Sequence, residues 1–161
     1  MTFIIDGTAG ATFPNGSNPQ AAPSKVLQVV SATYNTLVST SSSTNVTSNL
    51  SASITPLFST SKILIVANIP STTSTSPNQV CCTIYRGSTN LALTGGSFPA
   101  FGQSYGNNSV VQANIGMAYL DSPATTSSTT YTVYFLSSNG GTVSLFQNNM
   151  TGTLTIMEIA A

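Results

Sequence analysis

Side chains that could catalyse a reaction are scarce in this sequence. It contains no histidine, and its three acidic residues, Asp6, Asp121 and Glu158, lie far apart along the chain. Hydrolysis by paired carboxylates needs two acids facing one bond, and Ser-His or Cys-His nucleophiles need an imidazole base. The phosphate-binding glycine loop of nucleotide-dependent enzymes is also missing. The sequence therefore predicts a protein that is not an enzyme.

The two cysteines, Cys81 and Cys82, are adjacent. Neighbouring side chains of a β-strand point to opposite faces, so the two sulfurs cannot join without straining the peptide between them. A metal site would need further ligands, and the chain has no histidine to complete one. We expect two reduced thiols, no metal ion and no other cofactor.

Residues 94–109 combine turn-forming glycines and asparagines with aromatic and amide side chains, in the order TGGSFPAFGQSYGNNS. The segment reads as a long loop between strands, and long loops often carry function. Aromatic faces together with amide groups suit neutral sugars. The candidate ligand-binding residues are Phe98, Phe101, Gln103, Tyr105 and Asn107. The alternative is that the aromatic rings pack back onto the fold as a lid.

The composition narrows the class of partner. Only 4% of the 161 residues are charged and the formal net charge is zero, so the electrostatic attraction that drives binding to nucleic acid or anionic membranes is missing. No apolar run approaches the ~18 residues of a spanning helix, and residues 1–5 lack the features of a signal peptide. We expect neither nucleic-acid binding nor membrane insertion, and a protein made in a cytoplasm without export.

Short β-type runs separated by Ser, Thr, Asn and Gly clusters fill the chain from residue 26 onward. Helix formers such as Glu, Lys and Arg are almost absent, so helix content should be close to nil. Runs at this spacing predict an all-β, jelly-roll-like antiparallel sandwich of about eight strands. The expected strands are 26–34, 50–55, 62–69, 79–86, 110–120, 131–136, 142–147 and 152–159.

Some of these runs have more apolar positions than one sandwich can bury. Residues 63–69 are apolar at almost every position, which indicates that both faces of that strand are covered. Tyr134, Leu136 and Phe146 are expected to add outward apolar groups. Three copies around an axis would cover such a surface, so we predict a homotrimer.

The few charged side chains are expected near strand ends. Arg86 precedes a glycine and Asp121 precedes Ser-Pro, so each should end a strand at a turn. A structural ion pair is the first interpretation, and ligand contact is the alternative.

The amino-terminal segment differs from the rest. Residues 1–24 alternate Gly and Pro with Thr, Asn and Ala, which predicts an extended arm ahead of a head domain at 25–161. Phe3, Ile4, Ile5 and Phe13 could anchor this arm on a partner protein.

Four runs carry a resemblance when they are taken together: ITPLFSTSKILIVANI, TIYRGST, YLDSPATTSSTTYTVYF and the terminal GTLTIMEIAA. They resemble small trimeric fibre or receptor-binding modules encoded in the tail regions of aquatic tailed phages, particularly those of cyanobacteria. The arm sequence GATFPNGSNPQAAP is similar to the phrase that precedes such modules. The family implies a location in the virion, trimeric assembly and a jelly-roll head, but it transfers no motif of binding residues.

The resemblance implies a bacteriophage structural protein that forms a tail-associated short fibre or fibre tip. The arm would then dock on another virion protein, and the 94–109 loop would contact a host surface glycan. The alternative is a trimeric capsid decoration, or cement, protein that binds no host. A secreted lectin-like domain is disfavoured by the missing signal sequence.

Overall fold

The computed structural model describes residues 4–6, 10–12, 25–73, 78–92, 100–107 and 109–161. Antiparallel strands dominate these residues, so the predicted all-β class is confirmed. The described part contains no α-helix, and its one helical turn is the 3₁₀ turn η1 (Gln147–Asn149). This is the outcome that the shortage of helix-forming residues predicts.

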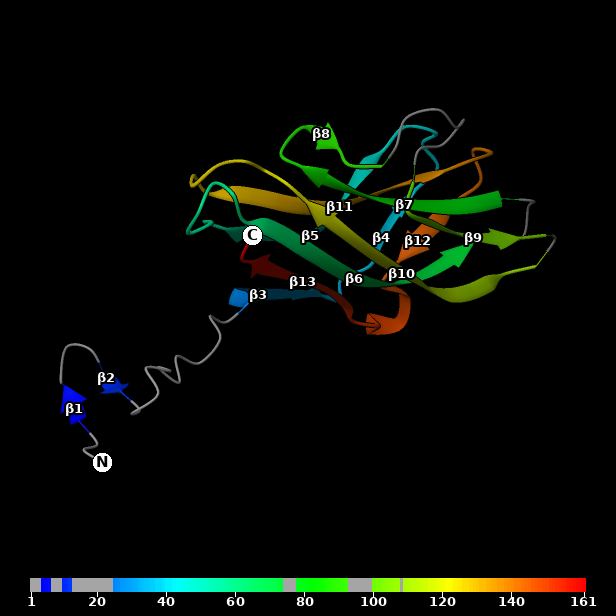
Figure 1. The fold of residues 1–161 in the computed structure, drawn as a ribbon. Helices are drawn as coiled ribbons and strands as arrows, with labels where there is room; N and C mark the ends of the chain where they lie inside the picture. Colours follow the sequence, from blue (N-terminus) through cyan, green and yellow to red (C-terminus); the bar gives the residue numbers. More distant parts are fainter. Residues whose placement is uncertain (1–3, 7–9, 13–24, 74–77, 93–99, 108) are drawn as a thin grey trace.

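Two sheets form the layers of a sandwich (Figure 1). The first sheet places four long strands side by side. Two short strands extend this sheet beyond the amino-terminal end of β13. Its order is β3 (Val26–Tyr34), β13 (Gly152–Ile159), β6 (Lys62–Thr73) and β10 (Val111–Asp121), with β12 (Val143–Leu145) on β6 and β4 (Val38–Thr40) on β12.

The second sheet has the order β5 (Val46–Ile54), β11 (Thr129–Ser137), β7 (Asn78–Arg86) and β9 (Gly102–Gly106), with β8 (Thr89–Asn90) also on β7. The chain crosses from one sheet to the other between β5, β6 and β7 and again between β9, β10 and β11. This alternation between two antiparallel sheets is the jelly-roll-like arrangement that the strand spacing predicts.

The core lies between the two layers and follows the two-residue alternation of strands. Val80, Cys82 and Ile84 are fully buried, as their spacing predicts. Two expectations about outward residues were wrong, because Leu136 is buried and Phe146 belongs to the core, where its ring packs edge-on against Tyr34. The backbone of Phe146 adopts a left-handed conformation (φ 60°), which turns the ring inward at the end of β12.

Strand β5 begins earlier than expected, at Val46, because the strand passes through a bulge in place of a turn. Asn49 takes a positive φ of 65° there, and the register with β11 shifts between Thr132 and Tyr134. The Ser48 hydroxyl donates to the Val133 carbonyl at 2.7 Å, which replaces a ladder hydrogen bond. Ser48 and Asn49 therefore form a bulge within the strand, although residue types of this kind are also typical of turns.

The segment read as one loop at 94–109 contains strand β9, which pairs with β7 from Gly102↔Cys82 to Gly106↔Asn78. A Cβ at position 102 would lie 2.6 Å from the Ile115 side chain, so glycine permits the close approach of β9 to β10. Gly102, one of the glycines that suggest a loop, is thus a packing requirement of an edge strand.

Within the predicted arm, β1 (Ile4–Asp6) and β2 (Gly10–Thr12) pair as a small two-stranded sheet. The arm was expected to be extended throughout, and this pairing is local structure that the sequence analysis did not anticipate. The division into an arm at 1–24 and a head at 25–161 stays a prediction.

Candidate functional site

The outward face of β9 carries three of the predicted ligand-binding residues. Gln103 and Tyr105 alternate with the buried Ser104, and Asn107 follows the strand; all three are exposed. Tyr105 leaves 49% of its surface open and lies opposite Gln79 of β7. One phenol ring and neighbouring amides therefore share one uncharged surface, as the sequence predicts for a sugar contact.

Phe101 has a different environment from the β9 residues. Its ring is half-buried against the core, with its centroid 5.1 Å from that of Tyr119, and its N–H donates to the Cys82 carbonyl at 2.9 Å. This is the packing that the alternative lid interpretation describes for this residue. Phe98 lies outside the described residues.

A second aromatic surface on the same sheet was missed by the sequence analysis. The rings of Tyr85 on β7 and Tyr134 on β11 lie 4.2 Å apart between centroids, both half-buried, and Asn45 Nδ2 donates to the Tyr85 hydroxyl at 3.2 Å. The alternation of β7 and β11 could have indicated their outward direction. Their contact could not be read from the sequence, because 49 positions separate the two tyrosines and only the strand pairing brings them together.

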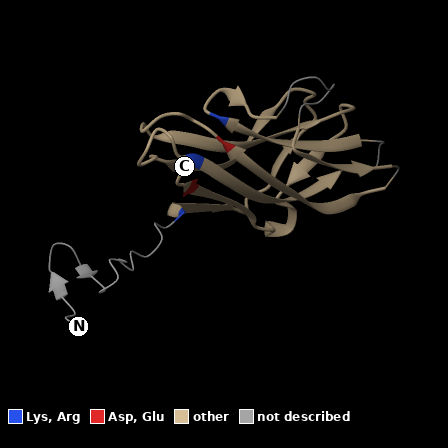
Figure 2. Ribbon diagram, viewed as in Figure 1, with Lys and Arg blue, Asp and Glu red and all other residues tan. Residues whose placement is uncertain are grey.

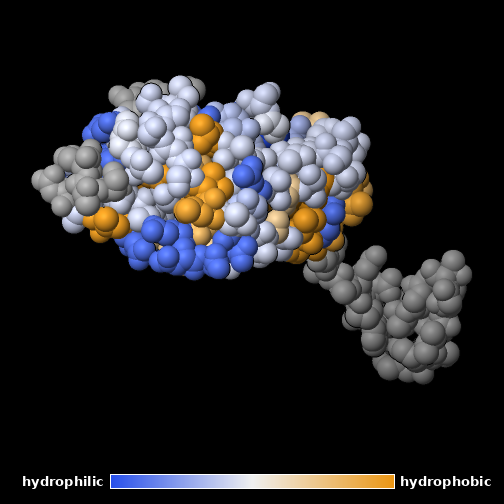
Figure 3. Space-filling view, turned by 180° about the vertical axis from the view of Figure 1, so that it is seen from behind, coloured by the Kyte–Doolittle hydropathy of each residue, from blue (hydrophilic) through white to orange (hydrophobic). Residues whose placement is uncertain are grey.

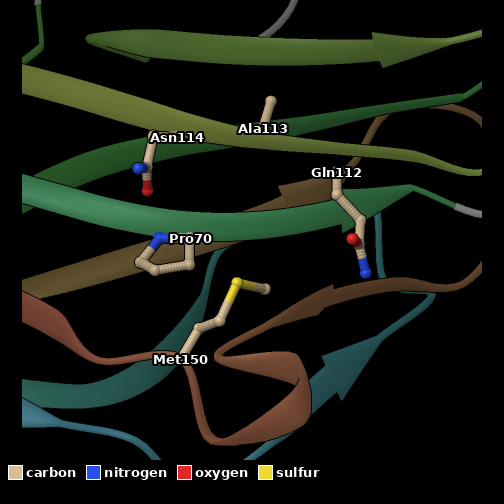
Figure 4. A pocket seen from close by; sticks show the side chains of 5 residues that line it. All are labelled: Pro70, Gln112, Ala113, Asn114 and Met150. Carbon is tan, nitrogen blue, oxygen red and sulfur yellow. The ribbon is translucent and has the colours of Figure 1, made fainter.

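Two adjoining pockets lie on the outer face of the first sheet, around the last third of β6. The first, of about 190 Å³, is lined by Pro70, Gln112, Ala113, Asn114 and Met150 (Figure 4). The second, of about 200 Å³, is lined by Thr72, Thr73, Val110, Thr142, Ser144 and Gln147. They adjoin because Thr72 is the strand partner of both Gln112 and Ser144. We call the two together the β6 groove.

The turn at 146–150 forms one wall of the β6 groove. Phe146, Asn148 and Asn149 all have positive φ angles between 57° and 60°, a conformation that asparagine tolerates but that is costly for phenylalanine. The turn lies where the partner of β6 changes from β13 to β12. Pro70 lies in β6 between these two pairings, and it has no N–H to donate to either strand. The Pro70 carbonyl instead accepts from the Phe146 N–H at 3.1 Å.

A third pocket, of about 400 Å³, lies at the other end of the sandwich between the β7–β8 turn and the β10–β11 loop, beside Arg86. Arg86 Nη1 lies 2.9 Å from both carboxylate oxygens of Asp121, so the predicted structural ion pair is confirmed. The hydroxyl of the buried Tyr131 donates to Asp121 at 2.7 Å. Burial, followed by this hydrogen bond to the carboxylate, raises the pKa of Tyr131. The three residues join the ends of β7, β10 and β11.

Charge is confined to one end of the sandwich. The five charged residues of the head, Lys25, Lys62, Arg86, Asp121 and Glu158, lie at the end where β3 begins and β13 stops (Figure 2). The residues of β9 and of the β6 groove carry no charge. The two ends of the head therefore offer different chemistry, one ionic and the other made of amides, hydroxyls and aromatic rings.

Glu158 is fully buried and organises the loop between β5 and β6. Its Oε1 accepts from the backbone N–H of Leu57 at 2.8 Å and of Phe58 at 3.3 Å, and Gln28 Nε2 donates to Oε2 at 2.6 Å. Burial opposes ionisation, but these donors outweigh it and hold the pKa of Glu158 below its ordinary value. The clamp fixes the backbone at Leu57 and Phe58, whose side chains are exposed at the charged end.

The outer face of the first sheet carries an apolar row near the same end. Val29, Met157, Leu64 and Leu120 are strand partners in succession across β3, β13, β6 and β10. Val29 is 57% exposed and Leu120 is 50% exposed. Figure 3 shows hydrophobic and strongly hydrophilic residues gathered in separate clusters on the surface. We call these four residues the apolar row.

Both cysteine side chains are buried. Cys81 and Cys82 are free, and burial raises the pKa of both thiols, so they are protonated at neutral pH. Among the described residues, no group of three or more His, Cys, Asp or Glu side chains is placed to hold a metal ion. None of the described helical structure is long and apolar enough to cross a membrane.

Ile4 and Ile5 of the predicted docking set lie in β1. Phe3 and Phe13 fall outside the described residues. Docking through these four residues stays a prediction.

Comparison with known proteins adds little to this picture. No family model matches the sequence, and no curated protein matches it. Among solved structures, the chain is similar to the infectious bursal disease virus VP2 subviral particle, with 13% identity over 83% of this chain and a TM-score of 0.42. The structure of the Gx strain of that virus gives 14% identity and a TM-score of 0.41. The chain spans 37% and 38% of those two chains.

Proposed function

We propose that this chain is a structural, non-enzymatic protein of a bacteriophage particle, working as a homotrimeric short tail fibre or fibre tip that contributes to attachment to the host surface. The observation that carries the proposal is the division of the head into two ends. The charged end bears the start of β3, and therefore the connection to the arm, together with the exposed Leu57 and Phe58. The uncharged end bears Gln103, Tyr105 and Asn107.

Each end suits one of the two contacts that a fibre must make. The arm and the loop that carries Leu57 and Phe58 together offer a surface for docking on another virion protein. An uncharged face of a phenol ring and amides can bind a neutral host glycan by stacking and hydrogen bonding. A rigid sandwich between them keeps the two contacts apart, which a fibre tip requires.

Trimeric assembly is part of the proposal and is supported by the apolar row. Single exposed apolar residues are ordinary on protein surfaces, but here the exposed Val29 and Leu120 are joined across four strands by the half-buried Met157 and Leu64. The low charge of the chain adds little repulsion between copies.

A capsid decoration protein is the second candidate, and the clamped Leu57–Phe58 loop favours it. A buried carboxylate that fixes the backbone of two residues with exposed apolar side chains builds a firm attachment surface, as a permanent clamp on a shell would need. In that case the uncharged end would face solvent and have no host ligand.

Immunogold electron microscopy of virions with an antibody against the head separates the candidates. Labelling confined to the tail supports the proposed function. Labelling spread over the whole capsid supports the decoration protein, and particles free of label, with the protein found only in cell extract, would overturn both.

Deletion of residues 1–24 tests the docking role of the arm. We expect the truncated protein to fold and assemble as the full chain does but to be missing from particles. Normal incorporation of the truncated protein would refute this role.

A further inference from the structure

We infer that the β6 groove is a binding site for a neutral carbohydrate, on the opposite sheet from β9. The assignment does not depend on the proposed function, since it concerns what the isolated protein binds. It starts from a single atom, the hydroxyl oxygen of Thr72.

Thr72 lines the groove with an unsatisfied polar group. The residue is 7% exposed, and its Oγ1 is buried without a hydrogen-bond partner among the described residues. Buried hydroxyls are nearly always paired, because leaving one unpaired is unfavourable. A valine of the same shape would avoid this penalty and suit a strand at least as well. The retained hydroxyl is therefore explained by a partner that arrives from outside the chain.

The surroundings of Thr72 define the chemistry of that partner. Gln112, Asn114 and Gln147 bring amide groups to the same groove, and none of them carries a side-chain hydrogen bond to a described residue. Pro70 and Met150 add apolar lining to the groove, on the same side of the first pocket (Figure 4). Neither pocket is lined by Lys, Arg, Asp or Glu, so an ionic ligand has no counter-charge there.

Size and shape favour a sugar over a protein partner. The two pockets are shallow and measure about 190 and 200 Å³, a size suited to a small ligand, whereas a protein interface extends over a broad surface. A sugar ring has hydroxyls for amide partners at its edge and C–H groups for the proline and methionine on its faces. The strained turn that carries Gln147 and Met150 indicates that this wall is built for a purpose beyond connecting two strands.

The test uses the full-length protein with a printed array of neutral and acidic glycans. Saturation-transfer NMR with the best neutral disaccharide follows, because a ligand of this size binds with a Kd on the order of 1 mM. We expect neutral glycans to bind, with a response that does not depend on ionic strength. Selective binding of acidic glycans, or failure of every glycan to bind at millimolar concentration, would overturn the inference.

Four variants locate the binding. Thr72→Val and Gln112→Ala should each weaken binding by on the order of tenfold, since each removes a hydrogen bond to the ligand. Thr33→Val makes the same change as Thr72→Val on an exposed position of the same sheet outside the groove, and it should bind as the parent does. Loss of binding in Tyr105→Ala with full binding in Thr72→Val would place the ligand on β9 and reject the groove.

The melting temperature of Thr72→Val separates a ligand role from a structural one. We expect this variant to melt at or above the temperature of the parent, because it removes an unpaired buried hydroxyl. A lower melting temperature with unchanged glycan binding would show that the hydroxyl serves the fold through an internal water, and the inference would fail.

Discussion

The carboxylate of Glu158 is buried, yet the donors around it favour its charged form. Sequence reasoning considered this residue only as a candidate catalytic acid and did not anticipate its clamp on the β5–β6 loop. The three donors come from Gln28, Leu57 and Phe58, at least 100 positions away in the sequence. A network closed by such distant segments has no local signature.

Glu158→Gln should remove a pH-dependent part of the stability. The folded pKa lies below the ordinary value of 4.5, so the ionised group stabilises the fold above that pH, and the contribution is lost as the pH falls through the folded pKa. An amide has one acceptor oxygen in place of two, so at pH 7 we expect a loss of about 2 kcal/mol in the free energy of unfolding.

Urea unfolding of parent and variant at pH 7 and pH 3 checks this expectation. The difference in free energy between the two proteins should shrink at pH 3, because that pH lies below the ordinary value of 4.5 and protonation of the carboxyl in the unfolded parent removes part of the stabilisation. An equal difference at both pH values would show that Glu158 contributes only through its packing.

At the scale of elements, alternation was a reliable guide and turn-type residues were not. Strands β3 and β13 have the predicted bounds, because both are rich in β-branched residues and neither contains a glycine or proline after its first residue. The sequence analysis did not predict β9, because Gly102 permits a close approach between β9 and β10 and does not mark a loop. It placed the start of β5 too late, because Asn49 forms a bulge within the strand. Both uses depend on a neighbouring strand that is distant in the sequence.

The contact between Gly152 and Phe146 predicts how tightly β13 is joined to the 146–150 turn. A Cβ at position 152 would collide with the ring of Phe146, which is buried in the core. Gly152→Ala should therefore lower the free energy of unfolding by about 1–3 kcal/mol. Gly116→Ala is the matched control, because its added Cβ meets nothing within 4 Å on the outward face of β10.

Thermal melts of both alanine variants distinguish these positions. The Gly116 variant should melt at the parent temperature or slightly above it, since alanine suits a strand better than glycine does. Equal melting temperatures for the two variants would mean that the ring of Phe146 moves aside without loss.

Phe101 and Tyr105 belong to one segment but should respond differently to truncation. Phe101→Ala removes a ring packed on the core and should destabilise the fold by about 2 kcal/mol, less than a fully buried phenylalanine. Tyr105→Ala removes an exposed ring and should leave the melting temperature unchanged. Under the proposed function, Tyr105→Ala should also reduce adsorption of particles to cells.

Adsorption assays over a range of salt concentrations complete this test. A contact made by rings and amides should depend little on ionic strength. Unchanged adsorption by the Tyr105 variant would remove β9 from the host contact, whatever the behaviour of the Phe101 variant.

At the scale of the whole molecule, the apolar row predicts how copies associate. Replacing Val29 and Leu120 together by lysine should place like charges in the interface and yield folded monomers. The matched control replaces Thr33 and Gly116 by lysine, four residues further along the same two strands, where the outward row is polar. Light scattering at micromolar concentration should give three times 16.5 kDa for the parent and the control.

A parent protein that scatters as a monomer while unfolding cooperatively would contradict the predicted homotrimer. A trimer that persists in the Val29 and Leu120 variant would place the interface on another surface. These outcomes can be told apart, because the first concerns the parent and the second only the variant.

The confinement of charge to one end of the head also determines how the protein can be handled chemically. Both lysines, Lys25 and Lys62, lie at that end, so amine-reactive coupling through their side chains attaches the head to a sensor chip or bead by its charged end. The β6 groove and the face of β9 carry no lysine and remain open to added ligand. The protein therefore presents its uncharged end after ordinary immobilisation, without an engineered tag.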